Sequence, residues 1–313
     1  MKRLTVLSIL FLCVLVSSCP THIAAATLPD PPPARSRHEI EVVLAKAPNS
    51  QPPNELKLLN IVLVADKKDH GPGEHDYPLW QKRWHTLLSA EPGPTNLYGP
   101  PRNTSGWQST GGPVKVTTAQ TWPGIQQFAS ADVVVVFCYI NWDQQKLRQL
   151  ERYLRRGGGF VLVHSATWAK PQPSQEVAGL TGVGGFAKWR HGPIKLKIAD
   201  RNHPICLGLP QHIEFIDESY WPPTPEVDGV EMNVLATSNE KINNDSPAGS
   251  PQPMFWTYER GKGRVFGCVP GHYNWTFDDP YFRLLLLRGI AWSARQPPYR
   301  LDSLATRGII LKD

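Results

Sequence analysis

The sequence predicts an α/β fold, a layered and mostly parallel sheet with helices on both faces. Short, continuously apolar segments at 58–65, 131–139 and 160–164 are typical of parallel strands that are buried on both faces. Polar loops and amphipathic helical segments separate these strands. Strands that alternate with helices place the helices on both sides of a single sheet.

The first 18 residues predict an export signal. A basic start, Met1-Lys2-Arg3, precedes an apolar run at 4–16 that is too short to span a bilayer as a mature helix. The next residues, Val16-Ser17-Ser18-Cys19, fit the small-residue pattern before a lipidated cysteine in bacterial lipoproteins, and cleavage after Ala24-Ala25-Ala26 is the alternative. Both alternatives place the mature protein outside the cytoplasm, as a periplasmic protein or as a lipoprotein anchored to the membrane through Cys19.

Residues 19–55 predict a proline-rich tether, because its prolines disfavour a regular helix and favour extended chain. Within it, Ile40, Val42 and Leu44 alternate with other residues, which predicts an added strand or a segment that wraps the domain. The remaining 56–296 has the size of one α/β domain, and 297–313 predicts a tail along the surface. The prolines of the tether are Pro29, Pro31, Pro32, Pro33, Pro48, Pro52 and Pro53.

Charge and cysteine pattern narrow the classes of function. The formal net charge of +6 falls by two, to +4, once Lys2 and Arg3 leave with the signal. No dense run of Lys and Arg follows, so we expect no nucleic-acid partner and a solvated charged surface. The five cysteines lack the spacing of a metal knuckle or a disulfide framework, and Cys138 and Cys268 lie in apolar runs, where we expect them to be buried.

The remaining elements follow from capping and turn residues. An aspartate that precedes each predicted helix marks its start, and a proline in the first turn supports two of these starts. Gly261-Lys262-Gly263 predicts a hairpin turn, and the chain between Cys206 and Trp221 predicts no regular element. The capping residues are Asp76, Asp143 and Asp279, and the further predicted strands are 114–117, 194–198, 233–236, 254–258 and 264–269.

Six segments carry a pattern that spans most of 56–293. In chain order they read IVLVADKKDHGPGEHDYP, RRGGGFVLVHSAT, GGFAKWRHGP, RNHPICLGLP, FIDESYW and PMFWTYERGKGRVFGCVPGHYNWTFDDPYFRLLLLRGIAW. In this order they resemble the trehalose-utilisation (ThuA-like) family. The resemblance implies a flavodoxin-like or class I glutamine amidotransferase-like fold. It also implies a role in processing disaccharides or their oxidised (keto) forms, which points to a carbohydrate ligand.

The resemblance places a histidine where amidotransferases carry their nucleophile. The corresponding strand, 160–163, leads into His164-Ser165-Ala166, and no cysteine is present at that turn. A cysteine-dependent amidotransferase mechanism is therefore not expected. Ser165 lacks the surrounding G-x-S-x-G elbow, which argues against a serine hydrolase.

Five histidines are expected at one rim of the sheet. They follow strands or a glycine-rich segment, and the carboxyl ends of parallel strands meet at one edge, where ligands bind. The family resemblance adds Asp217 and Glu218, in the segment DESY, to the same rim. The five histidines are His70, His75, His164, His191 and His272.

Two chemical interpretations of this rim are open. In the first, a divalent metal such as zinc is held by some of five side chains and polarises a sugar carbonyl or a water molecule. In the second, no metal is present, and His164, His272 and Glu218 act as acid and base on the sugar. The candidate metal ligands of the first interpretation are His70, His75, His164 and His191, together with the carboxylate of Glu218. The predicted substrate contacts, which include aromatic faces for sugar rings, are His70, His75, His191, Tyr220, Trp168 and Trp275.

Each site prediction has a structural alternative. His164 is otherwise a buried, hydrogen-bonded core histidine, and His70 with Asp69 only shapes its loop. Asp217 and Glu218 are otherwise an acidic pair on the surface. At the level of function, the alternatives are an enzyme of the hydrolase, lyase or isomerase type and a non-catalytic carbohydrate-binding or scaffold module on the same fold.

Overall fold

The computed structural model describes residues 28–48, 54–104, 111–242 and 249–313. The predicted export signal and the lipidated Cys19 lie outside these residues. Within the described ranges, no helix has both the length and the apolar character that a bilayer crossing requires.

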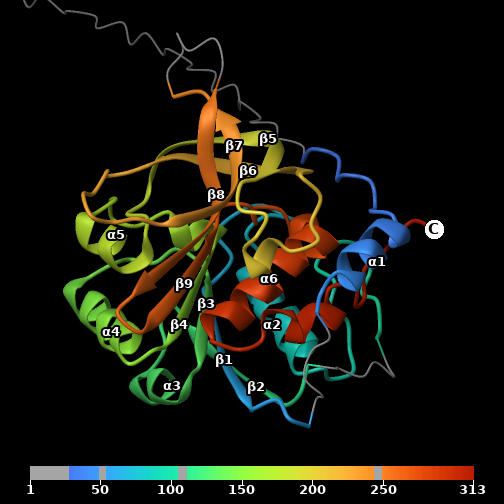
Figure 1. Cartoon of the computed structure of the whole chain (residues 1–313), viewed down its shortest axis with the longest axis horizontal. Helices are drawn as coiled ribbons and strands as arrows, with labels where there is room; N and C mark the ends of the chain where they lie inside the picture. Colours follow the sequence, from blue (N-terminus) through green and yellow to red (C-terminus); the bar gives the residue numbers. More distant parts are fainter. Residues whose placement is uncertain (1–27, 49–53, 105–110, 243–248) are drawn as a thin grey trace, which may run out of the picture.

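One nine-stranded sheet forms the centre of the molecule (Figure 1). Its order is β2-β1-β3-β4-β9-β8-β7-β5-β6; the strands from β2 to β9 are parallel, and those from β9 to β6 are antiparallel. Each strand predicted from the sequence corresponds to one of these. The strands are β1 Leu59–Ala65, β2 Val114–Gln120, β3 Val133–Phe137, β4 Gly159–Val163, β5 Phe186–Ile198, β6 His212–Pro223, β7 Asn233–Glu240, β8 Ser250–Arg260 and β9 Gly263–Cys268.

Helices cover both faces of the parallel half, so the α/β fold class is confirmed. α2 and α6 lie on one face, and α3, α4 and α5 lie on the other (Figure 1). The predicted caps are confirmed, since the carboxylates of Asp76, Asp143 and Asp279 accept backbone N–H bonds at the starts of α2, α4 and α6. The helices are α1 Arg37–Ala45, α2 Tyr77–Leu88, α3 Ile125–Ser130, α4 Gln144–Arg155, α5 Gln175–Thr181 and α6 Pro280–Ser293.

Residues 37–45, which contain the segment predicted to add a strand or to wrap the domain, form the helix α1. The predicted strand is wrong, because the prolines of this region flank the segment and none falls within it. The segment does pack on the domain, with Ile40 and Val43 in the core. Ile40 and Val43, three positions apart, are 0% and 2% exposed, whereas Val42 points to solvent. The apolar pattern therefore has helical spacing rather than the alternation of a strand.

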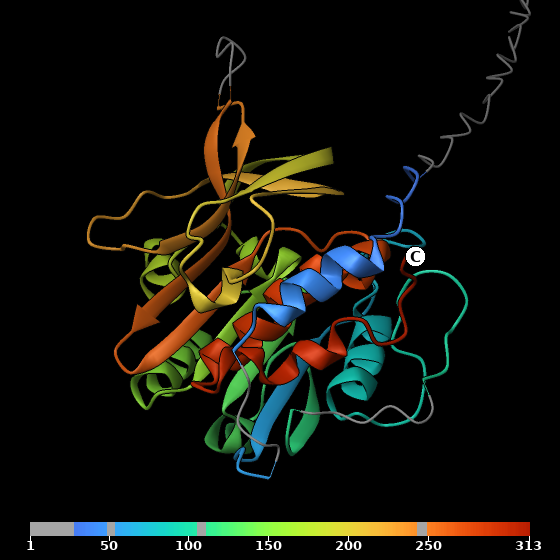
Figure 2. The ribbon, with the colours of Figure 1, turned by 45° about the vertical axis from the view of Figure 1, so that its right-hand side comes forward.

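The C-terminal residues 297–313 pack into the fold, which corrects the prediction of a surface tail. Leu301 and Leu304 are fully buried beside α6, and Figure 2 shows α1 (blue) beside α6 and this last segment (red). Backbone bonds from Arg37 N to Lys312 O and from Lys312 N to Arg35 O, each 2.8 Å, join the two ends of the described chain. These two segments cover α6, whose residues are buried on every side.

The region between Cys206 and Trp221, predicted to be irregular, contains most of β6. Ile213 and Phe215 alternate with exposed neighbours, as in a half-buried strand. The pattern is hidden in the sequence because the next buried positions are acidic, Asp217 and Glu218. This correction matters for function, because β6 delivers Glu218 to the site.

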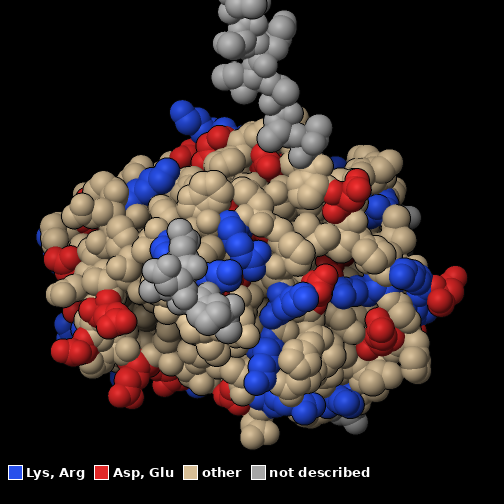
Figure 3. Space-filling model, turned by 90° about the horizontal axis from the view of Figure 1, so that it is seen from above, with Lys and Arg blue, Asp and Glu red and all other residues tan. Residues whose placement is uncertain are grey.

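The surface carries both signs of charge, and Lys and Arg gather near the middle of the face shown in Figure 3. A cavity of about 410 Å³ lies where β5 and β7 diverge, with Arg190, Lys195 and Lys197 on its walls. Arg190 is neutralised by Glu240, at 2.7 Å. Among the described residues, Lys195 and Lys197 have no ion-pair partner, so the basic area is small.

Candidate functional site

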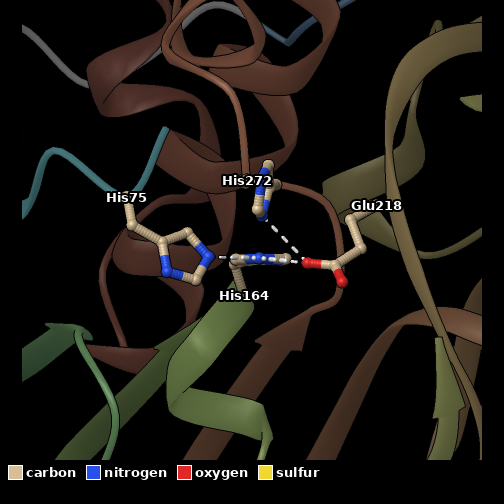
Figure 4. Close-up of side chains that lie close together, drawn as sticks. All are labelled: His75, His164, Glu218 and His272. Carbon is tan, nitrogen blue, oxygen red and sulfur yellow. Dashed lines mark hydrogen bonds and ion pairs between the residues drawn. The ribbon is translucent and has the colours of Figure 1, made fainter. Parts of the chain in front are cut away.

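Three loops at the carboxyl ends of parallel strands meet a side chain from the antiparallel half (Figure 4). His164 directly follows β4, His272 follows the adjacent β9, and His75 lies in the loop after β1. Backbone bonds from His75 N to His272 O and from Asn274 N to Gly73 O hold two of these loops together. Glu218 reaches the same place from β6.

These four side chains form a buried cluster, which we call the His/Glu cluster. The Nε2 atom of His164 lies 2.9 Å from Nε2 of His75 and 3.2 Å from Oε2 of Glu218. His272 Nδ1 lies 2.9 Å from the same Glu218 oxygen. The four residues are between 0% and 7% exposed, so bulk water screens their interactions little.

Hydrogen bonds on the far side of two rings decide which nitrogens carry protons. His164 Nδ1 donates to the carbonyl of Val269, at 2.6 Å, and His75 Nδ1 donates to the Asp69 carboxylate, at 3.0 Å. Burial lowers the pKa of His75 to about 3, so this ring is neutral. When His164 is neutral as well, two Nε2 lone pairs face each other at 2.9 Å, and only a cation or a proton between the rings removes this repulsion.

His272 has close neighbours but no aligned hydrogen bond. Its Nδ1 is near Glu218, and its Nε2 is 3.3 Å from Glu74 Oε1, yet neither ring nitrogen meets hydrogen-bond geometry. We attribute these contacts to electrostatic attraction. Burial opposes a charge on the ring, but Glu218 and Asp217 outweigh burial and raise the pKa of His272.

The charge of Glu218 is stabilised by the surrounding imidazoles. Burial alone would raise its pKa, but hydrogen bonding and charge from His164 and His272 hold the pKa of Glu218 well below its usual range. The Tyr220 hydroxyl lies 3.1 Å from Glu218 Oε2 and 2.8 Å from His164 Nε2. Because a hydroxyl has one proton, it can donate to only one of them at a time.

Asp217, which the sequence left between a site residue and a surface residue, is a fully buried anchor. Its Oδ1 accepts the backbone N–H groups of Gly271 and His272, each at 3.0 Å, and that of Glu218 at 2.7 Å. The hydroxyl of Thr276 donates to its other oxygen. Asp217 thus positions both Glu218 and the loop that carries His272.

Backbone conformation at the cluster is constrained. His75 and His164 have φ values of 39° and 49°, in the left-handed region that side chains other than glycine rarely adopt. Such strain is concentrated at functional sites. Gly271, at φ 137°, passes so close that an added Cβ would lie 3.0 Å from the Cβ of His164, so only glycine suits this position.

The other two predicted histidines lie outside the cluster, toward solvent. The side chains of His70 and His191 are 37% and 39% exposed. His70 contacts Asp69 and packs against His75, with ring centroids 3.9 Å apart. His191 Nε2 is 3.9 Å from Glu218 Oε1, and its Nδ1 is 3.0 Å from the hydroxyl of Tyr273.

The predicted aromatic contacts divide into two groups. Tyr220 stacks on His164, with centroids 4.8 Å apart, and Trp168 meets Tyr220 edge-on at 5.0 Å. Trp275 is 5% exposed, stacks on Tyr273 and donates its indole N–H to the carbonyl of Ile216. It lines a separate cavity of about 210 Å³, so only Tyr220 and Trp168 lie beside the cluster.

The donor set fits a divalent metal. One ligand atom from each of His75, His164, Glu218 and His272 lies within 4.8 Å of the others, and imidazole with carboxylate is a donor set that suits zinc. Asp69 behind His75 and the Val269 carbonyl behind His164 are the second-layer partners that metal-binding histidines have. Of the metal ligands expected from the sequence, His75, His164 and Glu218 belong to this set. His70 and His191 lie outside it, and His272 is the ligand that the sequence did not predict.

Sequence reasoning missed several residues that shape the site. Glu74, Tyr77 and Tyr273 contact the histidines directly, and nothing in the sequence separates them from ordinary loop or helix residues. Asp69 gave a signal, because a carboxylate beside two histidines suggests an orienting partner. The three described cysteines, Cys138, Cys206 and Cys268, are free and buried, which confirms the prediction for the first and the last.

Comparison with known proteins gives a family and two similar structures. The family model described as "ThuA: Trehalose utilisation" matches residues 104–293. A ThuA-like protein of Bacteroides uniformis has a TM-score of 0.55 and 18% identity, and the alignment covers 81% of this chain and 98% of that one. A ThuA-like protein of Parabacteroides merdae has a TM-score of 0.51 and 21% identity, with 76% and 90% covered. No curated protein sequence matches this chain significantly.

Proposed function

Because this chain belongs to the trehalose-utilisation (ThuA) family, we propose that it is an exported enzyme that acts on disaccharides or on their oxidised (keto) forms. One observation carries the catalytic part of the proposal. Three imidazoles and a carboxylate converge in a buried cluster in which the Nε2 atoms of His75 and His164 meet at 2.9 Å and neither nitrogen of His272 has an aligned hydrogen bond. Buried polar groups that serve stability alone are normally paired, so this arrangement favours ligand binding.

We assign the roles within the cluster from its geometry. His75, His164 and Glu218 would hold a divalent ion such as zinc through Nε2, Nε2 and Oε2, and three protein ligands are typical of catalytic zinc sites. When bound, the ion supplies Lewis acidity for a sugar carbonyl or a water molecule. His272, between Glu218 and Glu74, would exchange a proton with the substrate.

The remaining residues orient the site. Asp69 and the Val269 carbonyl keep the Nε2 atoms of His75 and His164 free of protons. Glu218 Oε1 and His191 face outward, where they would contact sugar hydroxyls. His70 and Trp168 would border the path to the cluster.

The principal test measures turnover and binding in parallel. Purified protein is incubated with trehalose and with keto-disaccharides, products are followed by NMR, and binding is measured by calorimetry. Glu218→Gln should abolish turnover, whereas Glu214→Gln, an exposed glutamate on the same strand, should not. Wild-type protein that turns over none of these sugars would contradict the enzyme proposal.

A second candidate is a non-catalytic carbohydrate-binding module. The near-complete burial of the four cluster residues favours it, because a sugar can approach them only across His70 and His191. In the experiment above, sugar binding without turnover by the wild-type protein would support this candidate.

Metal analysis separates the two chemical versions of the enzyme. Elemental analysis should find about one divalent ion per chain, and His75→Ala should lose it, whereas His85→Ala, on the exposed part of α2, should keep it. Protein that stays fully active and free of metal in a chelator would overturn the metal version. Acid–base chemistry by His164, His272 and Glu218 would then remain.

Export is proposed from residues 1–18, with Cys19 as a lipid anchor. The described part of the predicted tether, residues 28–48, packs on the domain through α1 instead of acting as a free linker. Mass spectrometry of protein from the membrane fraction should find a lipidated N-terminus at Cys19, and Cys19→Ser should release the protein. An N-terminus after Ala26 would support ordinary cleavage instead. Protein that retains residues 1–18 would contradict export.

A further inference from the structure

Trp189 stands out among the tryptophans because it is exposed. It lies in β5 and is 56% accessible to solvent, and no other described tryptophan is classed as exposed. A large aromatic side chain left in water gains little for folding, and exposed apolar surface beside a site is typical of a ligand-binding surface.

The pairing of β5 with β6 places Trp189 on the same face as the His/Glu cluster. Trp189 lies opposite Tyr220, and His191 lies opposite Glu218. Residues directly opposite in an antiparallel pair share a face, and so do alternate residues along a strand. These four side chains therefore form one patch on the cluster side of the sheet.

The two residues that flank Trp189 in β5 make contacts with another part of the sheet. Lys188 donates to the carbonyl of Ile242, and Arg190 binds Glu240. Both contacts tie the strand to the β7–β8 hairpin. They fix β5 on either side of Trp189 and leave the indole itself as a rigidly mounted, uncovered surface.

The indole of Trp189 lies near the His/Glu cluster, with His191 between them. The ring of Trp189 lies 5.4 Å, centroid to centroid, from the ring of His191, in an edge-to-face arrangement. His191 Nε2 in turn lies 3.9 Å from Glu218 Oε1. One imidazole thus separates the indole from the outer oxygen of the cluster.

We propose that Trp189 is the stacking platform for a second, non-reacting sugar ring, so that the site selects a disaccharide or a longer glycoside over a free monosaccharide. This inference rests on the proposed function and narrows its substrate class. The apolar face of a sugar ring packs on an indole. A ring stacked there places its glycosidic partner over His191 and Glu218.

The test compares two ligands and three variants. Affinities for trehalose and for glucose are measured by calorimetry on the Glu218→Gln background, in which turnover is blocked. Trp189→Ala should weaken trehalose binding by about tenfold, the scale of an aromatic stacking contact, and leave glucose binding unchanged. Trp189→Phe should retain most of the affinity. Tyr98→Ala, an exposed aromatic on a separate cavity, should change neither affinity.

The outcomes distinguish this inference from the proposed function. An unchanged trehalose affinity in Trp189→Ala overturns the platform, even if the wild-type enzyme turns over disaccharides. Equal losses for both sugars also overturn it, because Trp189 would then only position His191. A selective loss of trehalose affinity, together with a wild-type protein that turns over none of the sugars, supports the platform and contradicts the enzyme proposal. Dissociation of a dimer by Trp189→Ala in sedimentation would assign the indole to an interface between copies and overturn the platform.

Discussion

Two buried polar regions of this protein are built on opposite principles. In the His/Glu cluster, the Nε2 atoms of His75 and His164 face each other at 2.9 Å, and His272 has no aligned hydrogen bond. Around α6, in contrast, each nitrogen of the buried Arg288 guanidinium has a partner. It makes a bidentate pair with Asp302, at 2.7–3.2 Å, and donates to the carbonyls of Leu207 and Ile205.

Arg283 repeats the pattern of Arg288. It is fully buried and donates to the carbonyls of Phe277, Arg307 and Thr95 and to the carboxylate of Asp278. A buried charge whose donors are all paired joins segments far apart in the chain and presents nothing to a ligand. The comparison teaches that pairing, rather than burial or charge, separates these two buried arginines from the His/Glu cluster.

The largest expected effect is a loss of activity on removal of His164 from the His/Glu cluster. His164→Ala should reduce kcat/KM for a disaccharide substrate by about 10²- to 10⁴-fold, as loss of a group essential to proton transfer or metal binding does. Its melting temperature should fall by several degrees while the protein stays folded, because the buried ring donates to the Val269 carbonyl and stacks on Tyr220. Steady-state kinetics and thermal unfolding check both parts, with His203→Ala as the control outside the cluster. Unfolding of His164→Ala would show that the ring is a core residue.

The next effect concerns Arg288 and is one of stability. Arg288→Met leaves Asp302 buried without its partner, and the free energy of unfolding should fall by about 3–5 kcal/mol. Activity per folded molecule should be unchanged. Urea unfolding with activity assays measures both.

The double variant Arg288→Met, Asp302→Leu supplies the control. It should recover most of the lost stability, since removal of both charges leaves no unpaired group. A single variant as stable as the wild type would mean that paired buried charges do not hold the C-terminal segment in place.

A smaller effect is expected from Asp69, which orients His75. Asp69→Asn should reduce metal affinity by about 10- to 100-fold, as loss of such partners does at other metal sites. Competition with a chelating dye measures the affinity. Asp66→Asn, whose carboxylate contacts only the backbone N–H of Lys67, is the matched control. Equal affinities for Asp69→Asn and wild type would separate Asp69 from the site.

The smallest expected effect is the loss of stability on removal of a helix cap that belongs to neither region. Asp143→Ala removes the N-cap of α4, an exposed carboxylate that belongs to neither region, and should cost about 1 kcal/mol of stability. Turnover should not change. Chemical denaturation provides the measurement, and any loss of activity would show that α4 is coupled to the site.

Sequence reasoning located much of the cluster because strand ends are a local feature. Apolar runs identify β1, β4 and β9, and the residues that follow them lie at one edge when the strands are parallel. His75, His164 and His272 could be placed together on this basis. His191 and His70 were assigned to the same group, but their position outside the inner cluster depends on side-chain directions that spacing does not reveal.

The sequence by itself determined the α/β class, the three aspartate caps, the β8–β9 hairpin and the histidines at strand ends, because each depends on residues close together in the chain. Tertiary structure alone decided that β6 brings Glu218 to those histidines and that Asp217 anchors the loop of His272. It also decided that α1 and the C-terminal residues cover α6. These features depend on pairing between segments far apart in the chain. In β6, the acidic residues at buried positions also interrupt the apolar alternation that would have predicted a strand.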